Sequence, residues 1–366
     1  MKNNYRKLGD YIQPVDIRNS DLKVSHLLGL SIEKCFIESI ANTIGTDFRP
    51  YKIVKKGQFA YGPVTSRNGD KITIALLKEV DVCIISSSYS VFEIIDTSKL
   101  LPEYLMLWFS RPEFDRYARY KSHGSVREIF DWDEMCRVEL PIPDIKEQQK
   151  IVDAYNSITK RIQIKQKINE NLEKTAQCLF DKTIAQKEKN GKLNDIATIT
   201  MGQSPDGDSY NENGNGEVFY QGKSDFGNRF VSERIFTTAP TRIANPNDIL
   251  LSVRAPVGVI NITQKKCCIG RGLAAISSKN KQNSFLFYTL KSLSPAFEIF
   301  NGEGTVFGSI NREGLKNLEI IIPDDNEIAK FEKHASKIDK EIENNELEIS
   351  KLQKIKKMLI SGISKR

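Results

Sequence analysis

The chain contains ELPIPDIKEQQKIV at residues 139–152 and, 180 positions later, EIIIPDDNEIAKFE at residues 319–332. In the first stretch Asp144 follows a proline and stands three residues before a glutamate, and Asp324 has the same place in the second. An aspartate and a glutamate at this spacing cap the first turn of a helix reciprocally, because each side chain accepts a hydrogen bond from the other residue's backbone N–H. The repeated phrase therefore predicts two helix starts, one in each copy of a duplicated unit.

A seam of mostly apolar residues follows each predicted helix start, at alternating spacings of three and four. The seam positions of the second helix are Ile328, Phe331, Ala335, Ile338, Ile342, Asn345, Ile349, Leu352, Lys356, Leu359 and Ile363, and those of the first are Ile151, Tyr155, Ile158, Ile162, Lys165, Asn169, Leu172, Ala176, Leu179 and Thr183. Each helix spans roughly 40 residues, or about 60 Å. Neither is expected to be stable alone in water, because most helical stability comes from burying one face. We therefore expect the helices, which end near Gly191 and Gly362, to bury their seams on each other as a parallel or an antiparallel pair.

Polar residues interrupt the middle of both seams. Asn345 is expected to face Lys165 or Asn169 and so to fix the register of the pair at some cost in stability. The alternative is that these polar positions form a docking site for a partner subunit.

The repeat extends upstream of the two helix starts. HGSVREIFDWDEMCRVELPIP (123–143) aligns with EGTVFGSINREGLKNLEIIIP (303–323), and each segment ends in a predicted short strand. Further upstream three more segments correspond between the halves. YLMLWFSRPEF and FLFYTLKSLSPAF are both predicted helices, and VCIISSSYSVFEI and CCIGRGLAAI are both predicted buried strands. VKKGQFAYG and ANPNDILLS are both predicted turns that enter a strand. The opening KLGDYI (7–12) answers KLNDIA (192–197). The chain is thus predicted to run globule, long helix, globule, long helix, with a period far beyond that of a solenoid.

Composition agrees with two domains. At 366 residues, with 39% hydrophobic and 28% charged side chains, the chain is long enough for two cores. Its net charge of +7 favours a polyanionic partner. No stretch has the length and apolarity of a membrane span, and the N-terminal residues lack the apolar core of a signal peptide, so a cytoplasmic location is expected. The six cysteines form no C-x-x-C pair and the three histidines stand far apart, so neither a structural zinc site nor a disulfide framework is predicted. No cofactor is predicted.

Three stretches of the sequence resemble nucleotide-binding or methyltransferase motifs, but each departs from its motif at a required position. GEVFYQGKS has one residue too many between its glycines for a phosphate-binding Walker A loop. GEGTVFG has Phe307 where a dinucleotide-binding motif needs glycine, and ANPND has Asn247 where an amino-methyltransferase loop has its second proline. No nucleophile-and-base pair is evident. The sequence therefore predicts that the chain is not an enzyme.

The order of these parts resembles the specificity subunit of type I restriction-modification enzymes, over nearly the whole chain. The second half is especially similar, with ATITMGQSPDGDSYNENG, FYQGKSDFG, NDILLSVRAPVGVINI and GTVFGSINREGLKNLEIIIP in that order. In the first half, VKKGQFAYGPVTSRNGDKITIA followed by SSSYSVFEI resembles another subtype of the family's recognition domain, and KEQQKI resembles its helix start. The second helix start departs from the pattern, because DNEIAKF lacks the glutamine pair.

The resemblance implies an α+β fold with two tandem target recognition domains. Each domain, at residues 1–143 and 191–323, is expected to be a mixed α/β globule with a small, irregular, mostly antiparallel sheet. The long spacer helices at residues 144–190 and 324–366 are expected to form an antiparallel coiled coil.

The resemblance also implies a non-catalytic subunit that binds double-stranded DNA. Each recognition domain would read one half of a split target, with an unread gap of roughly 10 base pairs, about one turn of B-DNA. The helices would bind two copies of a methyltransferase (modification) subunit, and restriction (motor and nuclease) subunits would join afterwards.

Candidate DNA-reading residues follow from side-chain chemistry, because forked and amide side chains read base edges whereas Lys, Arg and hydroxyl groups hold phosphates. In the first domain they are Tyr61, Thr65, Ser66, Arg67, Asn68, Lys71, Ser87, Tyr89, Lys121, His123, Ser125 and Arg127. In the second they are Gln203, Ser204, Tyr220, Gln221, Lys223, Arg229, Ser252, Arg254 and Arg271. Arg254 and Arg271 stand out, because each ends an apolar strand beside residues that permit close backbone approach.

Two other functions fit parts of the sequence. A coiled-coil scaffold that joins two proteins without touching DNA would explain the seams but not the polar, glycine-rich loops of both globules. A self-contained nuclease or methyltransferase would require a catalytic centre that no motif supplies.

Overall fold

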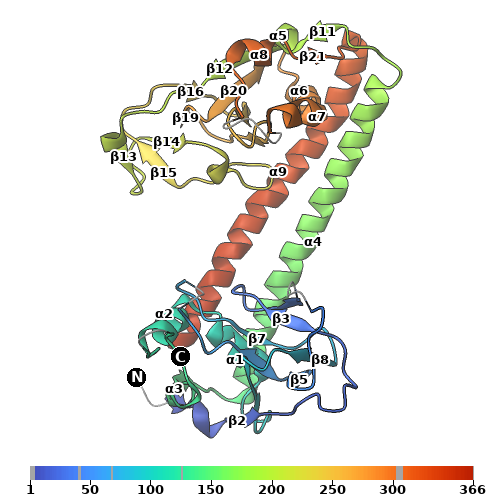
Figure 1. The fold of residues 1–366 in the computed structure, drawn as a ribbon. Coiled ribbons are helices and arrows are strands. Elements are labelled where there is room, and N and C mark those ends of the chain that lie inside the picture. The colour runs from blue at the N-terminus through green and yellow to red at the C-terminus, as the bar shows by residue number, and fades with distance from the viewer. Residues whose placement is uncertain (1–4, 40–42, 67–68, 125–126, 302–307, 366) are drawn as a thin grey trace. The chain divides into compact units, whose positions relative to one another are not determined.

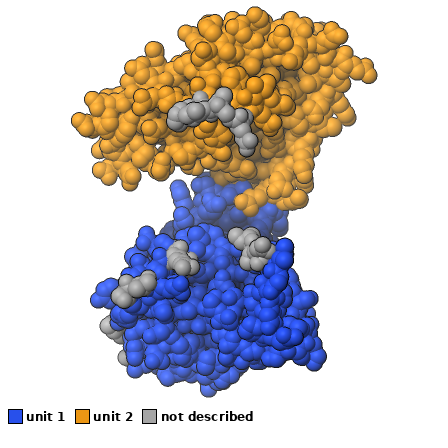
Figure 2. All heavy atoms as spheres, viewed as in Figure 1, with its two compact units in different colours: residues 1–164, 348–366 blue, residues 165–347 orange. Residues whose placement is uncertain are grey.

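The computed structural model describes residues 5–39, 43–66, 69–124, 127–301 and 308–365 of the chain. The chain divides into two compact units, drawn in blue and orange in Figure 2. Unit 1 comprises Met1–Ile164 and Glu348–Arg366, and unit 2 comprises Lys165–Leu347. Each unit therefore combines a globule with one end of each of two long helices.

The long helices are α4 (Ile145–Ile184) and α9 (Asp325–Gly362), shown in green and red in Figure 1. Contacts between them are, in unit 1, Tyr155 with Lys356 and Arg161 with Glu348, and, in unit 2, Lys165 with Asn345 and Phe180 with Phe331. Within each unit the residue numbers rise along α4 as those of their partners fall along α9. The pair is therefore antiparallel in each unit, which confirms the predicted arrangement.

Both helices begin at the predicted caps. The Asp144 carboxylate accepts a hydrogen bond from the backbone N–H of Glu147 at 3.0 Å. Asp324 accepts from the N–H of Glu327 at 2.9 Å, and the Glu327 side chain accepts from the N–H of Asp324 at 3.1 Å. This reciprocal pair satisfies two donors that the first turn of a helix otherwise leaves unpaired.

The first long helix ends earlier than the sequence suggested, whereas the second ends near the expected glycine. α4 ends at Ile184 rather than at residue 190, because Gln186 has a φ of 59° and this left-handed conformation stops a helix. α9 ends at Gly362, and Ile363–Lys365 form a single 3-10 turn.

The predicted seams are the buried faces of the two helices. Fully buried seam residues are Ile151, Ile162, Asn169 and Ala176 of α4, and Ile328, Phe331, Ala335, Ile342, Asn345 and Ile349 of α9. Gln148, which the sequence reasoning missed, is also fully buried: it accepts a hydrogen bond from Leu101 N–H and donates to the carbonyls of Lys99 and Pro143. This glutamine ties the first turn of α4 to the globule of unit 1.

A polar cluster occupies the seam in unit 2. Asn345, which is 1% exposed, accepts a hydrogen bond from Lys165 Nζ at 2.7 Å and donates one to Asn169 Oδ1 at 2.8 Å. Asn169 in turn donates to Glu346 Oε1 at 2.8 Å. Asn345 therefore faces both of the residues that the sequence offered as its partners.

Replacing Asn345 with leucine is expected to destabilise the helix pair by about 1 kcal/mol, because it leaves Asn169 buried without this hydrogen bond while Lys165 can turn toward water. The double variant Asn169→Leu with Asn345→Leu should recover most of that loss, since both buried polar groups are then gone. Urea denaturation of the wild type, both single variants and the double variant measures the coupling. Additive losses would show that the two asparagines do not stabilise each other.

Unit 1 is built around a four-stranded antiparallel sheet with the strand order β2-β9-β6-β7. Its strands are β2 (Ile12–Val15), β9 (Ser90–Ile94), β6 (Phe59–Tyr61) and β7 (Ile74–Leu76). The two-stranded pairs are β1 (Tyr5–Lys7) with β10 (Glu139–Pro141), β3 (Leu28–Leu30) with β4 (Phe36–Glu38), and β5 (Lys52–Lys55) with β8 (Val82–Ile85). The short helices are α1 (Pro102–Phe109), α2 (Pro112–Tyr120) and α3 (Trp132–Arg137).

Unit 2 repeats this plan with a four-stranded antiparallel sheet of order β12-β20-β17-β18. Its strands are β12 (Ala197–Met201), β20 (Leu273–Ser278), β17 (Ile249–Ser252) and β18 (Ile260–Ile262). A second sheet holds β13 (Tyr210–Asn211), β15 (Ile235–Thr237), β14 (Glu217–Tyr220), β19 (Cys267–Ile269) and β16 (Ile243–Ala244), and β11 (Gly191–Lys192) pairs with β21 (Glu319–Ile320). The helices are α5 (Leu193–Ile196), α6 (Asn283–Ser292), α7 (Ser294–Glu298) and α8 (Arg312–Lys316).

The two sheets match strand for strand in chain order, which is what a duplication predicts. Asp131 and Asn311, 180 positions apart, are the N-caps of α3 and α8 and accept equivalent hydrogen bonds at 2.8 Å. Two predictions need correction. The segments at 104–114 and 285–297 each span two helices, not one. The segments at 82–94 and 267–276 are each two strands joined by a turn, not one buried strand. The turns place Ser87 and Arg271 at the surface of their units, whereas Gly270 is buried.

Each unit has its own hydrophobic core, which includes residues of the long helices. In unit 1, Ile151 and Val152 of α4 and Ile363 pack with the globule. In unit 2, Phe180 of α4 and Phe331 of α9 do the same. Neither globule is thus separate from the helix ends that its unit contains.

Candidate nucleic-acid interface

Val64 of unit 1 and Arg254 of unit 2 occupy equivalent places, just after the matched strands β6 and β17. The backbone pairs Val64 with Ile129 and Arg254 with Ser309, and these partners are 180 positions apart. The flanking hydrogen bonds are, in unit 1, Thr65 N to Glu128 O (3.0 Å) and Phe130 N to Pro63 O (2.8 Å), and, in unit 2, Ala255 N to Gly308 O (2.9 Å) and Ile310 N to Val253 O (3.0 Å). The same backbone frame therefore holds both segments: residues 63–65 with 128–130 in unit 1, and residues 253–255 with 308–310 in unit 2. In unit 2 this frame presents an exposed arginine.

A second pair of matched turns connects β8 to β9 and β19 to β20. In unit 1 this turn carries the exposed Ser87, and in unit 2 it carries the exposed Arg271. The backbone N–H of Arg271 donates to Ser204 Oγ at 3.4 Å, and Val253 N–H donates to the Gly272 carbonyl at 2.9 Å. The turn around Arg271 thus lies against both the segment that follows β12 and the segment that carries Arg254.

Glycine permits this close approach of loops in unit 2. A Cβ on Gly202 would lie 2.1 Å from the Gly270 carbonyl oxygen, and one on Gly272 would lie 2.6 Å from the Gln221 carbonyl oxygen. Any larger residue would therefore force these segments apart. The exposed side chains of Gln203 and Gln221 consequently belong to the same loop cluster as Arg271.

A buried carboxylate shapes the turn at residues 221–225. Asp225 is 3% exposed and accepts hydrogen bonds from the backbone N–H of Gln221 at 2.8 Å and of Gly222 at 3.4 Å. Asp225 also pairs with Arg234 at 3.2 Å. Lys223, which lies between Gln221 and Asp225 in the turn, is exposed. The buried Asp225 carboxylate therefore fixes the backbone of the turn, while the Lys223 side chain faces solvent.

The loop cluster of unit 2 is polar and basic, with Gln203, Gln221, Lys223, Arg254 and Arg271 exposed. Amide and guanidinium groups are those that read base edges in the major groove, and cations also hold phosphates. Sequence reasoning missed Arg234 and the exposed Arg242, whose carbonyl accepts a hydrogen bond from Ile269 N–H. Neither arginine belongs to a segment that the repeat singled out, so no signal in the sequence pointed to them.

Among the residues that the structure describes, the matching cluster of unit 1 carries fewer exposed cations without an ion pair. Ser66, Ser87, His123 and Arg127 are exposed. Among the other candidates, Lys71 is exposed but pairs with Glu33 at 2.8 Å, the half-buried Lys121 lies 4.0 Å from Glu134, and Tyr89 packs beside Gly62. Arg67, Asn68 and Ser125 lie outside the residues that the structure describes, as do Val126, Gly304 and Val306 of the sequence alignment.

Five candidate residues are buried and cannot reach a base or a phosphate in this conformation: Tyr61, Thr65, Tyr220, Arg229 and Ser252. Burial raises the pKa of Tyr61 to about 12 and also raises the pKa of Tyr220. These side chains have structural contacts instead, as when Ser252 Oγ donates to the Pro256 carbonyl at 2.7 Å. The sequence placed these five side chains at the surface, and the structure corrects this, because all five are buried.

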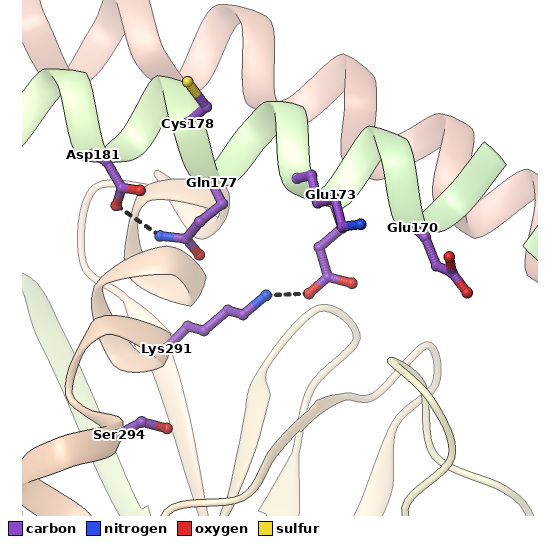
Figure 3. Close-up of a pocket in the computed structure, with 8 residues that line it drawn as sticks. Glu170, Glu173, Gln177, Cys178, Asp181, Lys291 and Ser294 are labelled. Atoms are coloured by element: carbon purple, nitrogen blue, oxygen red, sulfur yellow. Dashed lines mark hydrogen bonds and ion pairs between the residues drawn. The ribbon is translucent and has the colours of Figure 1, made fainter. Parts of the chain in front are cut away.

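A groove of about 740 Å³ lies between α4 and the α6–α7 segment within unit 2 (Figure 3). It is lined by Glu170, Glu173 and Asp181 together with Lys174 and Lys291. Lys291 pairs with Glu173, and Gln177 donates to Asp181 at 2.9 Å. Three carboxylates against two lysines do not favour a phosphate, so this groove is a poor match for DNA.

Within the described ranges, no group of three or more His, Cys, Asp or Glu side chains is placed to hold a metal ion. No helix in that part of the chain has both the length and the apolar character of a membrane span.

Comparison with known proteins places these features in context. The sequence profile described as "Type I restriction modification DNA specificity domain" matches residues 41–174 and 186–357. A Methanocaldococcus jannaschii protein described as "Putative type I restriction enzyme MjaX specificity subunit" is 30% identical over 290 residues, which are 72% of this chain and 67% of that protein. The type I restriction enzyme MjaIX specificity subunit of the same organism is 25% identical over 299 residues, 73% of this chain and 69% of that protein.

The fold has a counterpart among solved structures. The crystal structure of the type I restriction-modification system S subunit from M. genitalium aligns with a TM-score of 0.62, covering 98% of this chain and 95% of that one. The two sequences are 14% identical, so this likeness concerns the fold alone.

Proposed function

Because the chain belongs to the family of type I restriction-modification DNA specificity domains, we propose that it is the DNA-recognition subunit of a type I restriction-modification complex. It is non-catalytic and reads a bipartite target, one part with each recognition domain. The observation that carries the proposal is that the family profile matches the chain twice, over residues 41–174 and 186–357, in step with the repeated sheet. The recognition domains are residues 1–143 and 191–323.

The reading surface in each unit is the loop cluster around the matched frame. In the second domain Arg254 and Arg271 contact base edges, with Gln203, Gln221 and Lys223 beside them. In the first domain Ser66, Ser87, His123 and Arg127 hold the corresponding places. The different side chains on one frame support the idea that the two parts of the target have different base sequences.

The partners are double-stranded DNA, modification subunits and restriction subunits. Two copies of one methyltransferase subunit bind, because a duplicated chain offers the same docking face twice, as a symmetric dimer does. Restriction subunits, which carry the motor and the nuclease, join that assembly in the cytoplasm.

Sequencing of methylated DNA from cells that produce this chain with its modification subunit tests the proposal. The expected result is methylation confined to one bipartite sequence, which disappears when the chain is omitted. Gel-shift titration at two salt concentrations adds a second test, because a phosphate-gripping protein loses affinity steeply with salt whereas a scaffold that ignores DNA shows no binding at all. Methyl transfer or cleavage by the purified chain alone would overturn the non-catalytic role.

A further inference from the structure

The Arg229 side chain is buried between the globule of unit 2 and the part of α9 in the same unit. It is 4% exposed, and its guanidinium donates to Asp339 Oδ1 of α9 at 2.5 Å and to Tyr288 Oη at 3.4 Å. The guanidinium carbon also lies 4.2 Å from the centre of the Phe287 ring. A cation held by a carboxylate and an aromatic face in a buried site has little freedom to move.

Arg229 stands at the tip of a short hairpin. The Gly227 N–H donates to the Phe230 carbonyl at 3.1 Å, and Phe226 pairs with Val231. Ser232 N–H then donates to the Asp225 carbonyl at 2.8 Å, which closes the hairpin at its base. These hydrogen bonds join residues 225–232 into one unit, which we call the hairpin 225–232.

The base of this hairpin is the turn that presents two proposed reading residues. Asp225 holds the backbone N–H of Gln221 through its carboxylate, and Lys223 projects from the same turn. The hairpin is also bonded to β18. Asn261 exchanges hydrogen bonds with the backbone of Gly227 at 3.1 and 3.2 Å, and Ile262 N–H donates to the Arg229 carbonyl at 2.9 Å. A continuous set of hydrogen bonds thus runs from Asp339 through Arg229 and the hairpin to the turn at Gln221.

Unit 1 has a buried cation at the comparable place, but with a different carboxylate. Lys34, between β3 and β4, donates to Asp115 Oδ1 at 2.7 Å, and its side chain is 9% exposed. Asp115 belongs to α2 of the globule, whereas Asp339 belongs to a spacer helix. The buried cation is therefore bound to a long helix in unit 2, through Arg229 and Asp339, but to a short helix of the globule in unit 1, through Lys34 and Asp115.

We propose that Arg229 and Asp339 are positioning residues that hold the hairpin 225–232 against α9 and so set the place of Gln221 and Lys223 on the second part of the DNA target. This inference rests on the proposed function. It also replaces the sequence-based interpretation of Arg229 as a DNA contact, which its burial rules out. Loss of the pair loosens the reading turn without removing any group that touches DNA.

Asp339→Asn tests the role, because it keeps the shape of the side chain and removes the charge that holds the guanidinium. Asp181→Asn, the same change at an exposed residue of α4, is the matched control. The full chain with its modification subunit is titrated against a duplex that carries the target sequence found by methylation sequencing. It is also titrated against duplexes with one wrong base pair in either part of that target. A wrong base pair typically weakens binding roughly 5- to 150-fold.

The expected result for Asp339→Asn is that discrimination in the second part of the target falls to about 2- to 3-fold or less, below that usual range, while discrimination in the first part stays at the wild-type value. The control variant should discriminate as the wild type does in both parts. Equal loss in both parts, or unchanged discrimination in a variant that melts at a lower temperature, overturns the positioning role.

Arg229→Lys keeps the proposal falsifiable if Asp339→Asn does not fold. Lysine keeps the charge but has neither the fork nor the planar face, so the same selective loss supports the proposal and wild-type discrimination overturns it. A wild type without preference in either part overturns the proposed function itself. A wild type that discriminates beside a variant that discriminates equally well overturns the positioning role alone.

Discussion

Arg254→Ala is expected to weaken binding to the cognate duplex by roughly 5- to 150-fold, or about 1–3 kcal/mol, and to change binding to random DNA far less. The reason is geometric. Backbone hydrogen bonds on both sides of Arg254 fix where its side chain leaves the surface, and a forked guanidinium on a fixed backbone is suited to a two-point contact with a guanine edge. Gel-shift titration on cognate and random duplexes of equal length measures both constants.

Lys265→Ala is the matched control for that experiment. Lys265 is also an exposed cation of unit 2, 66% exposed and paired with Glu233, but it stands outside the loop cluster around the frame. Removing the Lys265 side chain should lower the affinity for both duplexes slightly and equally. This is expected for a charge that contacts no DNA group and only adds to the positive electrostatic potential of the protein. If Arg254→Ala behaved in the same way, Arg254 would be a phosphate contact or a bystander.

Phe180→Ala is expected to destabilise unit 2 by about 3–5 kcal/mol, the usual loss when a large aromatic ring is removed from a packed core. Phe180 comes from α4 and is 1% exposed, and its ring contacts Phe285 and Tyr288 of α6 and Phe331 of α9 at centroid distances of 5.8, 6.2 and 5.7 Å. One side chain therefore joins three helices. Urea denaturation monitored by far-ultraviolet circular dichroism reports the loss.

An exposed residue of the same helix provides the comparison. Ile164 is 51% exposed, and Ile164→Ala should change stability by no more than about 0.5 kcal/mol. A small effect for Phe180→Ala would mean that the end of α4 in unit 2 does not need the globule for its stability. In that case the helix and the globule would unfold in separate transitions.

The sequence predicted the long helices well because their signals are local and repeated. The caps at Asp144 and Asp324 and the seam spacing are set by residues a few positions apart, so no tertiary information is needed to find them. The C-terminal end of α4 was misplaced, because the left-handed residue that stops it is a glutamine and not the expected Gly191. Residue type alone does not indicate that a glutamine adopts such a conformation.

The candidate site was predicted less completely, because residue type does not tell which side chains of a short strand are buried. All three residues of β6 and all four of β17 are buried, so Tyr61 and Ser252 were wrongly assigned to the surface, although Arg254, two positions after Ser252, is exposed. Arg229 was misassigned for a different reason. An arginine is usually exposed, and only the aspartate 110 positions away explains why this one is not.

The frame around Val64 and Arg254 bears on how such a protein changes over generations. Its hydrogen bonds join backbone to backbone, so they form whatever side chain stands between them. A point mutation at that position therefore alters what the surface offers to a base while leaving folding almost untouched. On the proposed role of this position in base reading, new target preferences are accessible to natural selection one substitution at a time.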